Sequence, residues 1–196
     1  MEFYVEAVER FQALYERASH CGIDEPNAMT LATAGDDGRP SARVILLKGA
    51  DQRGFVFYTN CASRKGEQIA AQPYVALCLF WAPLMEQVRV EGRALPVTDA
   101  EADAYWKTRA RQSQIGAWAS HQSRPSEGIE ELEARIADFT NRYADQPVPR
   151  PDYWSGYRVK PELIEFWEGG RYRQRIHRRT CYREVGGHWE KDELDP

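Results

Sequence analysis

Short runs rich in β-branched and aromatic residues, each bounded by a turn signal, recur over residues 28–95 and again over residues 153–194. The clearest turn is Asp37-Gly38, since Asp-Gly between two apolar runs is a strong hairpin signal. Short strands at this close spacing favour an antiparallel barrel or sandwich over alternating strand–helix–strand units. We therefore expect an α+β protein with one closed antiparallel β-barrel of about six to eight strands, and helices packed outside it.

The strand pattern and the helix signals together predict a single domain over residues 1–196. Apolar positions at helical spacing predict helices over residues 4–18, 63–72 and 127–143, the last expected to be the longest. Thr98 and Glu101 form a capping box that predicts the start of another helix. The predicted strands span residues 29–34, 42–48, 55–58, 75–81, 87–95, 153–159, 163–167, 174–184 and 189–194.

Composition narrows the class of protein. Hydrophobic residues make up 42% and charged residues 29%, which indicates a globular chain and not a disordered one. The formal net charge of −4 argues against a general nucleic-acid binder. The chain offers neither a signal peptide nor the roughly 18 consecutive apolar residues that cross a bilayer, so we expect no membrane span. The four cysteines lack metal-ligand spacing, which predicts reduced thiols, no metal site and a cytoplasmic protein.

The densest charge pattern is a row of Arg171, Arg173, Arg175, His177 and Arg179 at every second position. On a strand this spacing places all five side chains on one face. Arginine suits planar, bidentate recognition of phosphate or carboxylate, so the row predicts an anion site. A charged edge strand, a protein interface and a nucleic-acid surface remain open as alternatives.

A second basic group, Ser63-Arg64-Lys65, opens the predicted helix over residues 63–72. Cations in a first helical turn face the positive end of the helix dipole, whereas a bound phosphate would make the same place favourable. An exposed basic turn is an equally good interpretation of these residues alone. Because the chain lacks a GxSxG elbow and an HExxH pattern, we expect a cofactor, and not a protein nucleophile or a metal, to carry the chemistry.

Several ordered motifs together resemble the pyridoxamine 5′-phosphate oxidase family, from about Pro26 to the end of the chain. They are Arg43-Val44-Ile45-Leu46-Leu47-Lys48, Phe57-Tyr58-Thr59-Asn60 with Ser63-Arg64-Lys65, Gln87-Val88-Arg89, Ser113 to Ser123, Trp154-Ser155-Gly156-Tyr157-Arg158-Val159, and Glu165-Phe166-Trp167. The resemblance implies a split β-barrel homodimer that binds FMN in clefts at the subunit interface, with no nucleic acid and no membrane as partner.

The resemblance also implies roles for individual residues. FMN contacts would fall on Arg43, Val44, Ile45, Leu46, Leu47, Lys48, Tyr58, Thr59, Arg64, Lys65, Gln87, Gln122, Ser123, Trp167 and Arg179. The substrate phosphate would be held by Lys48, Tyr105, Arg109 and Ser113, and the catalytic pair facing the pyridine ring would be Arg175 and His177. The stretch after Trp167 is longer than is usual in the family, so Arg173 competes with Arg175 for its role.

The implied reaction is oxidation of pyridoxamine or pyridoxine 5′-phosphate to pyridoxal 5′-phosphate. A hydride passes from C4′ of this small phosphorylated pyridine to FMN, and O2 reoxidises the flavin with release of H2O2. Two alternatives remain open: a flavin oxidase of the same fold acting on another ring, as in late phenazine biosynthesis, and an FMN-free protein that binds a polyanion through the arginine row.

Overall fold

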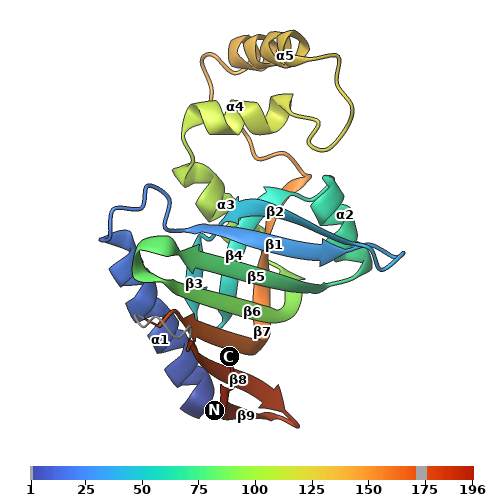
Figure 1. Cartoon of the computed structure of the whole chain (residues 1–196). Coiled ribbons are helices and arrows are strands. Elements are labelled where there is room, and N and C mark those ends of the chain that lie inside the picture. Colours follow the sequence, from blue (N-terminus) through green and yellow to red (C-terminus); the bar gives the residue numbers. More distant parts are fainter. Residues whose placement is uncertain (1, 171–175) are drawn as a thin grey trace.

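The computed structural model describes residues 2–170 and 176–196 (Figure 1). Nine strands in these residues form one curled antiparallel sheet in the order β2-β1-β5-β6-β7-β4-β3, and β8 and β9 extend it from β7. The strands are β1 (Ala28–Ala34), β2 (Pro40–Leu46), β3 (Gly49–Asp51), β4 (Gly54–Asn60), β5 (Tyr74–Trp81), β6 (Glu86–Pro96), β7 (Trp154–Glu168), β8 (Arg178–Val185) and β9 (His188–Leu194). The antiparallel sheet is as predicted. Its strand pairings leave β2 and β3 unjoined, so the closed barrel expected from the strand spacing is wrong and the split barrel that the resemblance implies is confirmed.

The predicted Asp-Gly hairpin is the β1–β2 connection. Ala34 pairs with Pro40, and between them Gly38 takes a φ of 69° that a side chain would disfavour. β2 ends at Leu46, earlier than predicted, so Lys48 follows the strand and its side chain is exposed.

The region predicted as two strands around Pro161 is a single strand, β7. Pro161 lies opposite Gly92, where the register between β6 and β7 shifts. A Cβ on Gly92 would come 2.1 Å from the Lys160 carbonyl oxygen, so glycine permits the close approach at this bulge. The extra residue of the bulge is Glu162 of β7, directly after the proline, so β7 continues through Pro161 as one strand.

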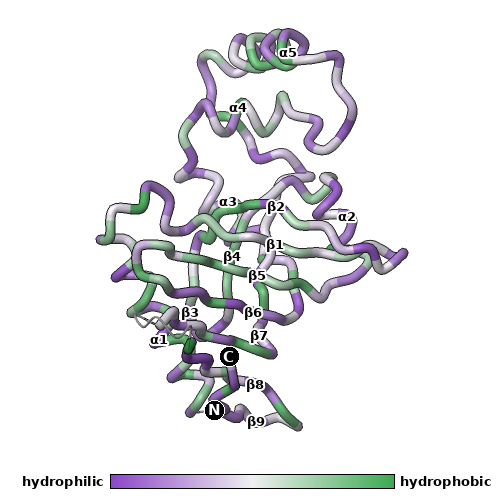
Figure 2. The backbone as a smooth tube through the Cα atoms, viewed as in Figure 1, coloured by the Kyte–Doolittle hydropathy of each residue, from purple (hydrophilic) through white to green (hydrophobic). Residues whose placement is uncertain are grey.

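The inner face of the sheet packs against α1 (Glu2–Ser19). Val8, Phe11, Leu14 and Ala18 are buried, as their spacing predicts, and the Phe11 ring meets that of Phe55 edge-on at 4.8 Å. Hydrophobic and hydrophilic segments alternate along the strands in Figure 2, as expected for a sheet with one buried face.

Helices α3 (Asp99–Thr108), α4 (Arg111–Ala119) and α5 (Ile129–Arg142) form an arm beyond one end of the sheet (Figure 1). The capping box is confirmed, with Thr98 and Glu101 exchanging both hydrogen bonds. α4 was not predicted, and α5 is shorter than α1, so the expected longest helix is wrong. The face of α5 predicted to be buried is only partly covered, since Ile129 is 60% exposed.

A short helix, α2 (Arg64–Ala71), follows β4 and carries the second basic group. A Cβ on Gly66 would come 2.1 Å from the Cys61 carbonyl oxygen, so only glycine lets the first turn lie this close to the preceding loop. Among residues 2–170 and 176–196, no helix has the length and apolar character needed to cross a membrane.

Candidate functional site

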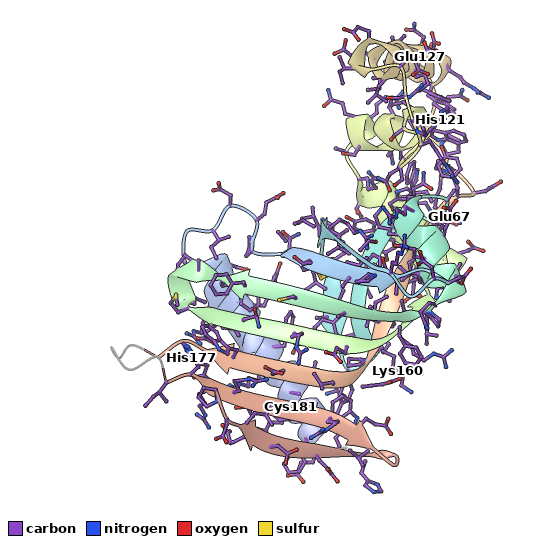
Figure 3. The ribbon with its side chains drawn as sticks, turned by 45° about the vertical axis from the view of Figure 1, so that its right-hand side comes forward. Glu67, His121, Glu127, Lys160, His177 and Cys181 are labelled. Atoms are coloured by element: carbon purple, nitrogen blue, oxygen red, sulfur yellow. The ribbon has the colours of Figure 1, made fainter. Side chains whose placement is uncertain are left out.

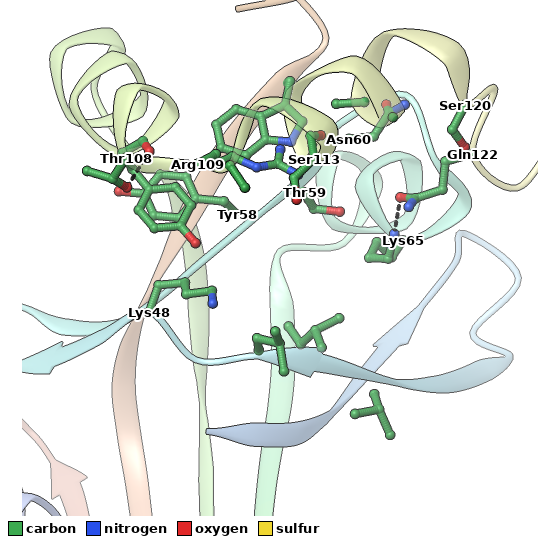
Figure 4. A pocket seen from close by; sticks show the side chains of 18 residues that line it. Lys48, Tyr58, Thr59, Asn60, Lys65, Thr108, Arg109, Ser113, Ser120 and Gln122 are labelled. Atoms are coloured by element: carbon green, nitrogen blue, oxygen red, sulfur yellow. Dashed lines mark hydrogen bonds between the residues drawn. The ribbon is translucent and has the colours of Figure 1, made fainter. Parts of the chain in front are cut away.

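A cavity of about 720 Å³ lies between β2, β4 and the helices α2, α3 and α4 (Figure 4). Its lining residues are Val44, Ile45, Leu46, Lys48, Tyr58, Thr59, Asn60, Lys65, Tyr105, Thr108, Arg109, Ala110, Ser113, Gly116, Ala117, Ser120, Gln122 and Trp154. Three of these described residues are cations and none is an acid. The cavity therefore favours an anionic ligand.

At one end of the cavity, Lys65 lies in the first turn of α2. Its Nζ donates to Ser63 Oγ at 2.9 Å and to Gln122 Oε1 at 2.6 Å (Figure 4). Burial, and then the charge of Arg43, lower the pKa of Lys65 to about 8. Ser63 is the N-cap residue but makes no side-chain cap hydrogen bond, which leaves first-turn N–H groups of α2 available to a ligand. Cations and helix dipole together make this end a phosphate-binding environment.

Arg43 and Arg64 complete what we call the basic cluster (Arg43, Arg64 and Lys65). Burial lowers the pKa of Arg43 and the charge of Arg64 lowers it further, so the two guanidinium groups repel each other. Within the described part of the chain, none of the three cations forms a salt bridge with a carboxylate. The cluster therefore holds uncompensated positive charge.

At the other end, three aromatic rings lie nearly parallel. Tyr58 stacks on Tyr105 at 4.0 Å and on Trp154 at 5.5 Å between ring centres. The Arg109 guanidinium lies 4.7 Å from the Trp154 ring centre, and its Nη2 donates to the Ser113 carbonyl oxygen at 3.0 Å.

The second terminal nitrogen of Arg109, Nη1, is buried and has no hydrogen-bond partner within the described chain. Burial lowers the pKa of this side chain. The Lys48 ammonium lies 6.0 Å from the Tyr105 ring centre on the same side of the cavity (Figure 4). A buried N–H without an acceptor is costly, so an anionic ligand accepting from Arg109 would stabilise this end.

A second group of predicted site residues lies outside the cavity. Gln87, Trp167 and Arg179 are cross-strand partners in one row over β6, β7 and β8, so they share a face of the sheet. The His177 ring lies 4.7 Å from that of Trp167, and its Nδ1 is buried without a partner among the described residues. In Figure 3, His177 lies at the end of the sheet away from Glu67 of α2.

The arginine row is only partly described. Arg171, Arg173 and Arg175 lie outside the described residues, so the choice between Arg173 and Arg175 stays a prediction. β8 begins at Arg178, so His177 lies just before the strand, where its ring packs on Trp167, the cross-strand partner of Arg179.

Arg179 is held in what we call the Glu165 triad (Arg89, Glu165 and Arg179). Glu165 is only 5% exposed and accepts from Arg89 Nη2 at 2.6 Å and from Arg179 Nε at 3.0 Å. Burial raises the pKa of Glu165, but the hydrogen bonds from Arg179 and Arg89 outweigh it and keep the pKa below its usual value. Arg89 Nη1 also pairs with Glu91 Oε1 at 2.7 Å, so the two cations of the triad face two carboxylates.

The cavity gathers most of the residues predicted from β2, β4, α2 and α4. Of the others, Arg43 and Arg64 lie beside Lys65 but do not line the cavity, Leu47 is buried in the hydrophobic core, and Ser123 follows Gln122 in a turn with a φ of 68°. The prediction missed Asn60, Thr108, Ser120 and Trp154, although Asn60, Ser120 and Trp154 lay in quoted motifs. Their position beside predicted residues was the only available signal.

Two family models match the chain. Residues 16–143 match the family model described as pyridoxamine 5′-phosphate oxidase. Residues 154–196 match the pyridoxine 5′-phosphate oxidase C-terminal dimerisation region, which supports a homodimer.

Curated relatives and solved structures are similar over nearly the whole chain. A pyridoxine/pyridoxamine 5′-phosphate oxidase of Myxococcus xanthus (strain DK1622) is 58% identical, over 96% of this chain and 91% of the relative. One from Rubrobacter xylanophilus is 53% identical, over 96% and 86%.

Among solved structures, PhzG of Burkholderia lata in complex with tetrahydrophenazine-1-carboxylic acid has a TM-score of 0.91 at 33% identity, over 96% of this chain and 92% of that one. A pyridoxamine 5′-phosphate oxidase-related, FMN-binding protein of Nostoc punctiforme shares the fold, with a TM-score of 0.77 at 18% identity over 95% and 97%. This chain belongs to the pyridoxamine 5′-phosphate oxidase family.

Proposed function

We propose that this chain is an FMN-dependent oxidase that converts pyridoxamine or pyridoxine 5′-phosphate to pyridoxal 5′-phosphate, with O2 as electron acceptor and H2O2 as product. The observation that carries the proposal is one cavity that has cations at both ends and no acidic lining residue. The chain is also 58% identical to a pyridoxine/pyridoxamine 5′-phosphate oxidase. Both the cofactor and the substrate carry a phosphate, and the cavity offers a basic group for each.

The residues fit the phosphate of FMN. The basic cluster has no carboxylate partner among the described residues, and two of its members, Arg64 and Lys65, lie in the first turn of α2. In this proposal Arg64 and Lys65 donate to the phosphate, and Gln122 keeps the Lys65 ammonium directed into the cavity. When bound at this end, FMN would supply the redox chemistry of the site, as acceptor of the hydride from C4′ of the substrate and as donor of electrons to O2.

The residues at the other end fit the substrate phosphate. Arg109 Nη1 is the buried N–H that lacks an acceptor, and Lys48, Tyr105 and Ser113 lie around the same part of the cavity. Charge-assisted hydrogen bonds from these groups would hold the phosphate and so fix the position of the pyridine ring. His177 and Arg175 stay proposed as the pair that faces the ring.

A shared site in a homodimer would bring the two groups of predicted residues together. Gln87, Trp167 and Arg179 lie on the outer face of the sheet, where Val44 and Phe80 are 67% and 53% exposed. Val44 also lines the cavity, so the cavity opens at this apolar face. Exposed apolar side chains of this kind mark interaction sites. We propose that the second subunit covers this face and places its Gln87, Trp167 and Arg179 against FMN.

Mixed subunits test the shared site. Arg64→Ala and Arg179→Ala each damage one half of it, so each homodimer should lose FMN. A refolded one-to-one mixture should regain intact sites in its heterodimers, roughly a quarter of the wild-type number. No recovery of FMN binding in the mixture would contradict a site shared between subunits.

Oxygen uptake tests the activity itself. FMN-loaded protein should consume O2 with pyridoxine or pyridoxamine 5′-phosphate and release H2O2 and pyridoxal 5′-phosphate. The runner-up substrate is a phosphate-free ring acid such as the one bound in the PhzG structure. Oxygen uptake with such a ring acid, and none with either B6 phosphate, would overturn the proposal in favour of that alternative.

A further inference from the structure

Arg43, the member of the basic cluster that lies on β2, is held entirely by neutral oxygens. Its Nη1 donates to Thr33 Oγ1 at 2.6 Å and to the Leu31 carbonyl oxygen at 3.2 Å. Its Nη2 donates to Ser41 Oγ. These contacts fix the guanidinium on β2 without neutralising its charge.

Gln68 of α2 closes this network. Its Oε1 accepts from Thr33 Oγ1 at 2.7 Å and from Ser41 Oγ at 2.8 Å, and lies 3.4 Å from Arg43 Nη2. Each hydroxyl therefore accepts from Arg43 and donates to Gln68, so one amide oxygen orients both arms of the guanidinium. Thr33 is only 3% exposed, which limits the access of water that could replace a lost partner.

Other partly buried arginines of the chain have carboxylate partners. Arg150 pairs with Asp99 and Asp103, and Arg158 pairs with Glu101. At the basic cluster the acceptor in the corresponding place is an amide. The amide has the shape of a carboxylate but no charge.

We propose that Gln68 is a positioning residue for the cofactor phosphate: it orients Arg43 with a neutral acceptor and so leaves the charge of the basic cluster free for the phosphate. The inference rests on the proposed FMN-dependent function and concerns how the site keeps its charge. The lowered pKa values of Arg43 and Lys65 agree with it, because burial and then a neighbouring cation lower each of them and no carboxylate raises them.

The proposal makes Gln68→Glu an informative substitution, because it adds one negative charge with almost no change of shape. A carboxylate at residue 68 would pair with Arg43 inside the protein. It should raise the melting temperature of the apoprotein and weaken FMN binding. If Gln68 only stabilised the fold, the substitution would change the melting temperature and the FMN affinity in the same direction.

The experiment measures dissociation constants of FMN and riboflavin by quenching of flavin fluorescence in the apoprotein, with melting temperatures in parallel. For Gln68→Glu we expect FMN binding at least about tenfold weaker and riboflavin binding within about twofold of wild type, since riboflavin lacks the phosphate. Gln72→Glu is the matched control, because it puts the same charge at an exposed position on the end of α2. This control should leave the dissociation constants of FMN and riboflavin within about twofold of their wild-type values.

Ser41→Ala is a milder probe of the same network, since it removes one relay between Arg43 and Gln68. It should weaken FMN binding about threefold and leave riboflavin binding unchanged. Wild-type FMN affinity in Gln68→Glu, or equal losses of FMN and riboflavin, would overturn the inference. Failure of the wild-type chain to bind FMN would instead overturn the proposed function, and the inference with it.

Discussion

The basic cluster and the Glu165 triad place arginines on the same sheet in opposite electrostatic settings. Arg43 is surrounded by neutral acceptors, whereas Arg89 and Arg179 share the carboxylate of Glu165. In the cluster, like charges lie close together without a counter-ion, which lowers the stability of the apoprotein. In the triad, carboxylates offset the positive charge of the arginines and fix the positions of their side chains.

Arginine therefore has two different roles in this protein, and counting arginines in the sequence does not distinguish them. A cation without a carboxylate partner attracts an anionic ligand, and a cation with one fixes the geometry of its neighbours. Arg179 belongs to the second kind, so its proposed contact with FMN would depend on the position of the guanidinium more than on its net charge.

The largest expected effect is on the triad. Glu165→Gln should lower the free energy of unfolding by about 3 kcal/mol, the low end for breaking a buried ion pair, since the partners are partly exposed. Urea unfolding of the apoprotein measures it. Asp192→Asn is the control, because its pair with Arg183 is about half exposed and should matter by under about 1 kcal/mol. Equal losses in the two variants would break the distinction between the regions.

The opposite result is expected in the basic cluster. Arg64→Ala should weaken FMN binding roughly 30-fold, the value of one hydrogen bond to a charged group, without lowering the free energy of unfolding. Flavin fluorescence titration and urea unfolding give the two numbers. Arg17→Ala removes an exposed arginine on α1 and should leave FMN binding unchanged. A loss of apoprotein stability in Arg64→Ala would count against an uncompensated cluster.

Arg109 extends the comparison to the other end of the cavity. Arg109→Ala should raise the KM for pyridoxine 5′-phosphate about tenfold and leave FMN content unchanged, because Lys48 and Ser113 still contact the substrate. Steady-state oxygen uptake and the flavin absorbance of purified protein measure the two effects. Loss of flavin to the same extent as in Arg64→Ala would contradict separate phosphate sites.

The smallest effect is on pH dependence. Because the pKa of Lys65 is about 8 in the apoprotein and a bound phosphate raises it, FMN binding above pH 8 takes up a proton. Affinity should therefore fall as pH rises, to about a quarter of its pH 7 value at pH 8.5. Lys65→Arg should remove this fall, since arginine stays protonated. If the FMN affinity of Lys65→Arg fell with pH in the same way, the pH dependence would belong to another group.

Local patterns in the sequence identified many of the elements that carry the site. The capping box at Thr98, the Asp-Gly hairpin and the apolar face of α1 depend on contacts within a few residues, and each is present. Pro161 misled the prediction because a bulge at Glu162 lets β7 continue through it, and that bulge depends on the close approach of Gly92 on β6. α4 was missed because no cap signal marks its start at Ala110.

By itself, the sequence determined the antiparallel strands, the basic residues at the start of α2 and the resemblance to the family. The tertiary structure decided which cations remain uncompensated. Arg89 meets Glu165 across two strands, and Arg43 meets Gln68 between a strand and a helix. Charge compensation depends on which side chains strand register and helix packing bring within a few ångströms. Residues far apart along the chain carry no local signal of that contact.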